Sequence, residues 1–231
     1  LKNQRSGIEF NQEYADLGFR SHICGTITAN IKELVPRKQL RFMGDGSAYS
    51  YISMAESIED ADLSEEDLAS EKTGLIIGSG VASGAPLVEM ADTLRNKGAR
   101  KVNPFYVPKI MSSCNAANLA TAFKIRGYSY TISSACATSG HCLGNAYQLI
   151  QAGEQDLIFI GGGDELSWVV SIAFDSMGAL SSNFNDNPQS ASRAYDLDRD
   201  GFVVSGGGGT IVLEEYERAK ARGAKIYCEV T

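Results

Sequence analysis

The sequence predicts an α/β protein with a largely parallel sheet and helices on both of its faces. Short apolar runs at 73–78 (TGLIIG) and 156–160 (DLIFI) have the composition of strands buried on both sides. Longer segments between such runs place apolar residues three and four positions apart, as amphipathic helices do. Strands that alternate with helices favour parallel pairing, because each helix returns the chain to the end of the sheet from which the strand started.

The elements are assigned in chain order from these two periodicities and from their boundary residues. Pro86 and Pro108 suit the first turn of a helix, and Ser64 followed by three acidic residues is typical of a capped helix start. The prediction is a short strand at 25–31; a helix at 47–61; an acidic turn from residue 64; a strand at 73–78; helices at 86–96 and 108–123; a strand at 128–133 leading into a helix that ends at 151; a strand at 156–160 closed by three glycines; a helix at 166–177; a strand at 210–213; a helix at 214–222; and a last strand at 226–230.

The composition excludes several classes of function. The 231 residues are 43% hydrophobic and 21% charged, as in ordinary globular proteins, and the net charge of −7 argues against a nucleic-acid partner. Every apolar run falls short of the roughly 20 residues that a membrane span needs, so no membrane association is expected. The five cysteines are irregularly spaced and form no CxxC pair. They indicate free thiols in a reducing compartment, and hence a cytoplasmic protein.

The positive charges of this acidic chain are clustered. One group comprises Lys32, Arg37, Lys38 and Arg41, and the other comprises Arg95, Lys97, Arg100 and Lys101. Such groups are often only solvated faces, but they could also receive a small acidic partner.

Cys136 lies where the strand at 128–133 turns into the following helix. The first backbone N–H groups of a helix are unpaired and partly positive, and they favour a thiolate over a thiol. The position therefore suits a nucleophile, although a cysteine is more commonly a small buried core residue.

The chain has two histidines. His141 is five positions beyond Cys136, whereas helix neighbours are three or four apart, and His22 lies in the irregular opening region, so a cysteine–histidine dyad is poorly supported.

Three cofactor motifs fail at identifiable positions. Gly78-Ser-Gly80 follows a strand, but the third glycine of a dinucleotide loop should stand at residue 83, which is serine. The run that starts at Asp196 copies the opening of an EF-hand, but its twelfth residue is Gly207 where a glutamate is required. The two histidines and their neighbouring cysteines lack a zinc-ligand spacing. We expect no metal.

Four separated motifs resemble those of the β-ketoacyl-acyl-carrier-protein synthases, in the same order along the chain. They are SSACATSGHC (133–142), GGG (161–163), FDSMGAL (174–180) and DGFVVSGGGG (200–209). The nearest subtype is synthase I, the bacterial elongating enzyme of type II fatty acid synthesis. The agreement of several motifs is more specific than any one of them.

The resemblance implies a thiolase-like fold, in which two similar halves stack as αβαβα layers. Residues 1–231 would form the N-terminal ketoacyl synthase domain, without the family's opening strand and without the C-terminal half. Two catalytic histidines, a lysine and a glycine-rich loop of the family have no matching positions here. We therefore expect the chain by itself to be unable to carry out the condensation.

The resemblance also implies roles for individual residues. Cys136 matches the nucleophile that takes the acyl chain from the carrier thioester, and its own backbone N–H would supply one oxyanion-hole donor. Met111 would reach in from the partner subunit, and Val170 replaces a longer side chain, so pocket length is left open. The acyl-pocket positions are Gly80, Met111, Ala135, Val170, Phe174 and Phe202, and the carrier-docking positions are Lys38, Arg41, Lys97 and Arg100.

The partners that the resemblance implies are the acyl carrier protein and a second copy of the chain. The substrate arrives on the carrier's phosphopantetheine, so no cofactor would be bound permanently. The homodimer would form through the strand before Cys136. Two other functions stay open from the sequence: a thiolase that acts on acyl-coenzyme A, and a non-catalytic subunit like a chain-length factor, although such subunits lose the thiol.

Overall fold

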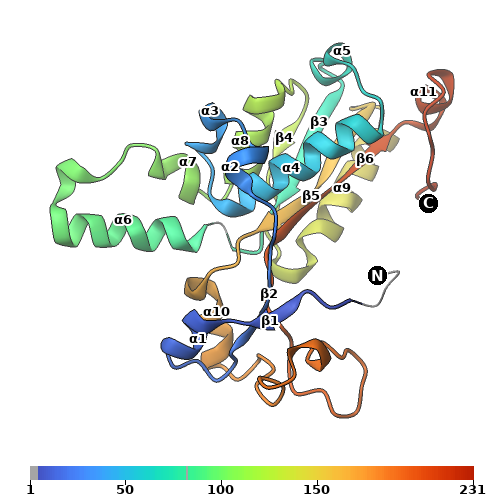
Figure 1. Ribbon diagram of the computed structural model, residues 1–231. Coiled ribbons are helices and arrows are strands. Elements are labelled where there is room, and N and C mark those ends of the chain that lie inside the picture. Colours follow the sequence, from blue (N-terminus) through green and yellow to red (C-terminus); the bar gives the residue numbers. More distant parts are fainter. Residues whose placement is uncertain (1–4, 82) are drawn as a thin grey trace. The chain divides into compact units, whose positions relative to one another are not determined.

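The computed structural model describes residues 5–81 and 83–231, which form two compact units (Figure 1). The sheet unit comprises residues 30–164 and 208–231. The small unit comprises residues 5–29 and 165–207. Each unit is described by itself.

The sheet unit is built on four strands in the order β4-β3-β5-β6. β3 runs parallel to β4 and to β5, with Leu75 opposite Ser129 and Thr73 opposite Leu157. β6 runs antiparallel to β5, because the Glu215 N–H donates to the Asp156 carbonyl at one end while Gly209 faces Gly161 at the other. The strands are β3 (Thr73–Gly78), β4 (Ser129–Tyr130), β5 (Leu157–Asp164) and β6 (Gly207–Glu214).

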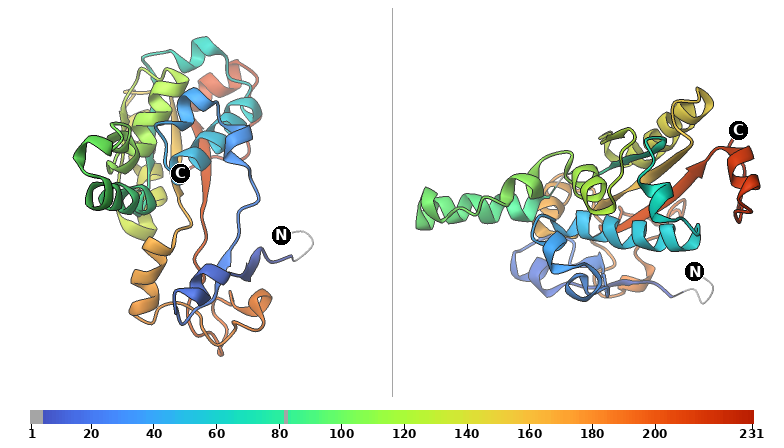
Figure 2. Two further views of the ribbon diagram at one scale, coloured as in Figure 1. Left: turned by 60° about the vertical axis from the view of Figure 1, so that its left-hand side comes forward. Right: turned by 90° about the horizontal axis from the view of Figure 1, so that it is seen from above.

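Helices cover both faces of this sheet, as predicted. Alternate residues of a strand point to opposite faces, so neighbours in β3 and β5 enter different cores. Leu75 and Phe159 are fully buried under α4 (Asp45–Asp60) and α8 (Cys114–Phe123), whereas Ile76 and Ile158 are buried under α9 (Thr138–Gln151). The right-hand view of Figure 2 shows α4 in light blue and α9 in yellow on opposite sides of the strands. Each such buried side chain contributes about 1.5–3 kcal/mol.

Shorter helices complete the sheet unit. Ser64 and Asp67 form a capping box in which each side chain accepts the other residue's backbone N–H. α6 extends away from the sheet, and the chain returns to it through α7 (Figure 1). These elements are α2 (Ile31–Leu34), α3 (Arg37–Leu40), α5 (Glu65–Leu68), α6 (Gly84–Lys97), η1 (Ala99–Lys101), α7 (Tyr106–Ile110), η2 (Ala135–Ala137) and α11 (Tyr216–Ala221).

The small unit has a core of its own around Tyr14. That ring stacks on Phe19 at a centroid distance of 4.7 Å, and its hydroxyl pairs with Ser171 Oγ at 2.7 Å. The buried Asp175 carboxylate accepts the backbone N–H groups of Arg20 and Ser21. The elements are β1 (Ile8–Phe10), which pairs antiparallel with β2 (Ile23–Gly25), α1 (Gln12–Asp16), α10 (Trp168–Ser176) and η3 (Pro188–Ser190).

Two predicted elements are interrupted in the structure. The helix expected at 108–123 breaks at Met111, whose backbone is extended (φ −64°, ψ 145°) between α7 and α8. The strand expected at 128–133 keeps ladder pairing only at Ser129 and Tyr130, after which the chain bends toward Cys136.

Other predicted boundaries were also wrong. The short strand at 25–31 is instead β2, which ends at Gly25. The glycine runs lie inside β5 and β6, where strands approach too closely for a side chain: a Cβ on Gly161 would overlap the Gly209 carbonyl. Residues 226–230, expected to be a strand, form no ladder among the described residues.

None of the helices within residues 5–81 and 83–231 is long and apolar enough to cross a membrane.

The close packing at the end of β3 gives a stability prediction. A Cβ on the buried Gly78 would overlap the Ile132 carbonyl oxygen and the Thr138 methyl group, so Gly78→Ala forces backbone to move. We expect a loss of about 2–3 kcal/mol in the free energy of unfolding. Gly140→Ala is the matched control, because nothing lies within 4 Å of a Cβ there and the residue is inside α9. It should gain about 0.5–1 kcal/mol. Urea unfolding measures the free energy of unfolding of both variants. Equal changes in the two variants would contradict the close packing around Gly78.

Candidate active site

Cys136 is exposed on a turn that leads directly into a helix. The chain leaves β4, passes through the single 3₁₀ turn η2, and enters α9 at Thr138. The predicted helix start is confirmed, with the difference that its first turn is 3₁₀. Within the turn the Ala137 and Thr138 N–H groups donate to the Ser134 and Ala135 carbonyls, and Cys136 lies at the positive end of the α9 dipole, which favours negative charge.

The turn contains a strained residue. Ala135 has φ +50°, in the left-handed region that costs a non-glycine residue about 1–2 kcal/mol. Side-chain hydrogen bonds hold it there: Thr138 Oγ1 accepts the Ser134 N–H at 2.9 Å and donates to the Ala135 carbonyl at 2.7 Å. The hydroxyl of Ser133 donates to the Ser79 carbonyl at 3.0 Å, which ties the turn to the end of β3. Strain held in this way is common where a nucleophile must be presented.

Polar side chains also join the ends of the neighbouring strands. Asp164 at the end of β5 accepts the Gly80 N–H at 3.1 Å and the Ser79 hydroxyl. The buried Asn115 of α8 donates to the Gly78 and Gly163 carbonyls at 3.0 and 2.9 Å. Its Oδ1 accepts the Ser47 hydroxyl of α4 at 2.7 Å. The carboxyl ends of β3 and β5 are thereby fixed beside the Cys136 turn.

The five cysteines divide by exposure. Cys24, Cys114 and Cys142 are buried, whereas Cys136 and Cys228 are exposed, and all five are free thiols. Burial raises the pKa of Cys24 and of Cys142, so both stay protonated at neutral pH. Cys136 is therefore the exposed thiol at a helix start.

Neither histidine pairs with Cys136. His141 Nδ1 lies 2.6 Å from Ser134 Oγ, and His22 Nε2 lies 2.9 Å from the Phe19 carbonyl in the small unit. Within residues 5–81 and 83–231 no side chain makes a hydrogen bond to the Cys136 sulfur, and no three His, Cys, Asp or Glu residues are grouped to hold a metal. His141 Nδ1 thus pairs with Ser134, a contact that its spacing from Cys136 did not predict.

The predicted pocket residues occur in both units. In the sheet unit, a Cβ on Gly80 would lie 3.8 Å from the Ala135 carbonyl oxygen, so these two residues are neighbours. Met111 lies at the junction of α7 and α8. In the small unit, Phe174 of α10 meets Phe202 edge to face at 5.3 Å, and Val170 lies one turn before Phe174.

The predicted docking residues form two separate groups within the sheet unit. Lys38 is exposed in α3, and the Arg41 guanidinium lies over the Phe105 ring, 4.0 Å from its centroid. Lys97 and Arg100 are exposed at the far end of α6 and in η1. Because α6 extends away from the sheet (Figure 1), one chain does not bring the two groups together.

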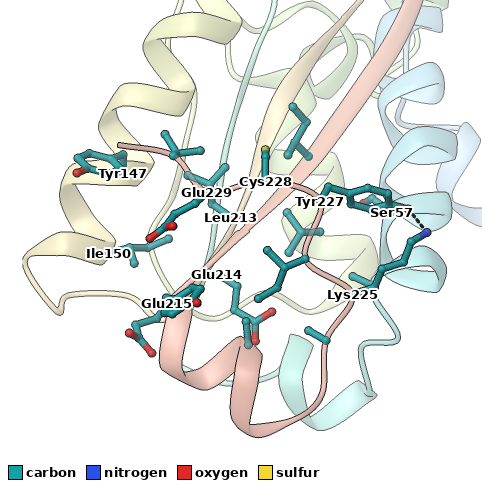
Figure 3. Close-up of a pocket in the computed structure, with 18 of the residues that line it drawn as sticks. Ser57, Tyr147, Ile150, Leu213, Glu214, Glu215, Lys225, Tyr227, Cys228 and Glu229 are labelled. Atoms are coloured by element: carbon teal, nitrogen blue, oxygen red, sulfur yellow. Dashed lines mark hydrogen bonds between the residues drawn. The ribbon is translucent and has the colours of Figure 1, made fainter.

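A hollow lies elsewhere in the sheet unit. Its volume is about 620 Å³, and it is lined by the end of α4, one side of α9, β6 and the C-terminal segment (Figure 3). Tyr147, Leu213 and Tyr227 are among the residues that line it. None of the predicted site residues belongs to its lining.

Comparisons with known proteins agree with these motifs. Residues 4–219 match the family described as Beta-ketoacyl synthase, N-terminal domain. The chain is 51% identical over 231 residues to 3-oxoacyl-[acyl-carrier-protein] synthase 1 of Haemophilus influenzae, and 51% identical over 232 residues to the Escherichia coli K12 protein of that name. All of this chain is covered in both cases, but it spans only 57% of each relative's length.

Solved structures show the same fold. A β-ketoacyl synthase from Burkholderia phymatum STM815 has a TM-score of 0.87 at 30% identity, over 97% of this chain and 55% of that one. A type II polyketide ketosynthase, solved in complex with its acyl-carrier protein, has a TM-score of 0.84 at 27% identity, over 97% and 55%. The thiolase-like fold expected from the motifs is confirmed.

Asn115 provides a test of the network behind the turn. Asn115→Ala removes the bonds that the amide donates to the buried Gly78 and Gly163 carbonyls and the bonds that it accepts from the Ser47 hydroxyl and the Cys114 thiol. We expect a loss of about 2–4 kcal/mol of unfolding free energy. The control Asn145→Ala, which removes an exposed bond to the His141 carbonyl within α9, should change it by less than about 0.5 kcal/mol. Similar losses in denaturant unfolding would show that the Asn115 contacts are unimportant.

Proposed function

Because the chain belongs to the β-ketoacyl synthase family, we propose that it is the N-terminal part of a 3-oxoacyl-acyl-carrier-protein synthase of fatty acid elongation. The observation that carries the proposal is an exposed thiol, Cys136, on a strained turn at a helix start and beside the carboxyl ends of parallel strands. Ligand and catalytic sites of open α/β sheets lie at that edge.

Cys136 is the proposed acyl acceptor. Its thiolate attacks the carbonyl carbon of an acyl thioester on the carrier's phosphopantetheine, and the carbonyl oxygen takes up negative charge. The Cys136 backbone N–H supplies one donor to that oxygen. The bond from carbon to the phosphopantetheine sulfur then breaks, and the departing thiolate is protonated. The acyl chain is left on Cys136.

The second step forms the carbon–carbon bond. A malonyl group on a second carrier loses carbon dioxide, and the resulting carbanion attacks the acyl-Cys136 carbonyl. The bond to the Cys136 sulfur breaks, the thiolate is regenerated, and the product is a β-ketoacyl chain two carbons longer. The histidines that would stabilise the decarboxylation have no match in residues 1–231, and both histidines of the chain are bonded elsewhere.

The partners follow from the same assignment. The acyl chain would contact Gly80, Met111, Ala135, Val170, Phe174 and Phe202, and the acidic carrier would dock on Lys38, Arg41, Lys97 and Arg100. A homodimer through the strand before Cys136 is supported by the position of β4, whose exposed Ser129–Tyr130 edge lies at the end of the sheet. We place the protein in the cytoplasm, with no bound cofactor.

Labelling of residues 1–231 tests the nucleophile. Iodoacetamide and an acyl-carrier thioester should both modify Cys136, and Cys136→Ser should abolish modification there while Cys228 still reacts. No condensation should be detectable, because the decarboxylating histidines are absent from this chain. Mass spectrometry of peptides measures the adducts.

The outcomes also separate the competing functions. Preferential loading from acyl-coenzyme A would favour a thiolase. An unreactive Cys136 in folded protein would favour a non-catalytic subunit, and condensation by residues 1–231 would contradict the assignment of the second step.

Charge reversal tests carrier docking in the full-length protein. Lys38→Glu and Lys97→Glu should each raise KM for carrier-bound substrate at least about fivefold and leave kcat nearly unchanged, because they act on encounter and binding. Added salt should shrink the difference. Lys32→Glu is the matched control, since Lys32 is exposed and belongs to the same positive cluster as Lys38 but is not among the docking positions. An equal effect of Lys32→Glu would indicate only general charge attraction.

A further inference from the structure

The structure pairs two side chains that flank the candidate nucleophile in sequence. Ser134, two residues before Cys136, and His141, five residues after it, approach to 2.6 Å between Oγ and Nδ1. The strand-to-helix turn lies between them, so the hydrogen bond closes the turn across Cys136. The chemistry of the thiol does not use this pair, because His141 is bonded to Ser134.

Two side chains of α9 hold Ser134 at different atoms. Thr138 and His141 are three positions apart and therefore on one face of the helix. Thr138 Oγ1 accepts the Ser134 backbone N–H at 2.9 Å, and His141 Nδ1 meets the Ser134 hydroxyl at 2.6 Å. Ser134 is thus fixed by its backbone and by its side chain.

The residue that follows Ser134 is the strained one. A left-handed Ala135, at φ +50°, persists only where its surroundings over-determine it. Thr138 is nearly buried, with 5% of its surface exposed, and it holds both sides of Ala135 through the Ser134 N–H and the Ala135 carbonyl. His141 adds the constraint on the Ser134 side chain. If it is lost, the turn can relax and the Cys136 sulfur spends less time in one orientation.

We propose that Ser134 and His141 form a positioning pair that sets the orientation, and so the reactivity, of Cys136. Ser134 Oγ and His141 Nδ1 bond to each other and not to the Cys136 sulfur, so we assign neither residue as a catalytic base. The inference rests on the proposed role of Cys136 as nucleophile. Small misplacements of a reacting atom lower rates substantially, so the loss of this hydrogen bond should slow Cys136 by about three- to tenfold.

Alkylation kinetics in the purified protein test the pair. The variants are Ser134→Ala, His141→Leu and the double variant, with the iodoacetamide rate read separately at Cys136 and at Cys228 by peptide mass spectrometry. Each single change should slow Cys136 and leave Cys228 unchanged. The double variant should be no slower than either single one, because both remove the same bond. The three buried cysteines report unfolding, since they should stay unlabelled.

Two further variants distinguish a hydrogen bond from simple packing. Asparagine carries a polar atom at the side-chain position of Nδ1, whereas the polar group of glutamine lies one bond further out. His141→Asn should therefore restore most of the Cys136 rate, and His141→Gln should not. Asn145→Ala is the helix-surface control, because Asn145 bonds only to the His141 carbonyl and leaves the pair intact. In the full-length protein, acyl transfer should slow in the same order, with KM for the carrier unchanged.

The results separate this inference from the proposed function. Selective slowing of Cys136, a non-additive double variant and rescue by asparagine support the positioning pair. Unchanged Cys136 rates, additive losses, or equal slowing in the Asn145→Ala control overturn it while Cys136 remains the nucleophile. If Cys136 in the unmodified protein reacts no faster than Cys228, the nucleophile assignment fails and the positioning role fails with it.

Discussion

The left-handed backbone of Ala135 is the constraint on which the candidate site depends. It lets the chain leave an edge strand and enter α9 within one 3₁₀ turn, which leaves Cys136 exposed at the helix start. An alanine pays a strain energy there that glycine would avoid, so the surrounding contacts must hold it. Thr138 donates to the Ala135 carbonyl, and Ser133 donates to the carbonyl of Ser79, which follows β3. Because Gly78 has no side chain, Ile132 and Thr138 can pack close to the end of β3.

Much of the fold could be predicted because its signals are local. The run TGLIIG is a strand with the predicted bounds, since residues buried on both faces of a parallel sheet must all be apolar or small. The helix at α4 and the capping box at Ser64 follow from periodicity and from cap chemistry, which act within a few residues. Cys136 was likewise identifiable, because a strand that runs into a helix at a lone cysteine is visible in sequence.

The features that could not be predicted depend on contacts between segments that are far apart in the sequence. Asn115 looks like an ordinary polar residue in a helix, and only the folded chain shows that it bridges the ends of β3 and β5. The predicted strands at 156–160 and 210–213 left out the glycines of β5 and β6, because sequence does not reveal that the Gly161 and Gly209 backbones meet. The contact between the Phe42 and Phe105 rings, whose centroids are 5.0 Å apart, is also non-local, because it joins the segment after α3 to the residue before α7.

If Cys136 has the proposed role, the contacts of the two histidines explain why the nucleophile is a cysteine and not a serine. Within the described residues, His22 is engaged with the Phe19 carbonyl and His141 with Ser134, so neither is available to Cys136 as a base. A serine hydroxyl in the same turn would need such a base to react, whereas a thiol is partly ionised near neutral pH and is intrinsically more nucleophilic. Backbone dipoles at a helix start can add to that tendency without any side-chain base. In the proposed arrangement the dipole at the helix start favours the thiolate, and the hydrogen bond between Ser134 and His141 sets the direction in which the sulfur points.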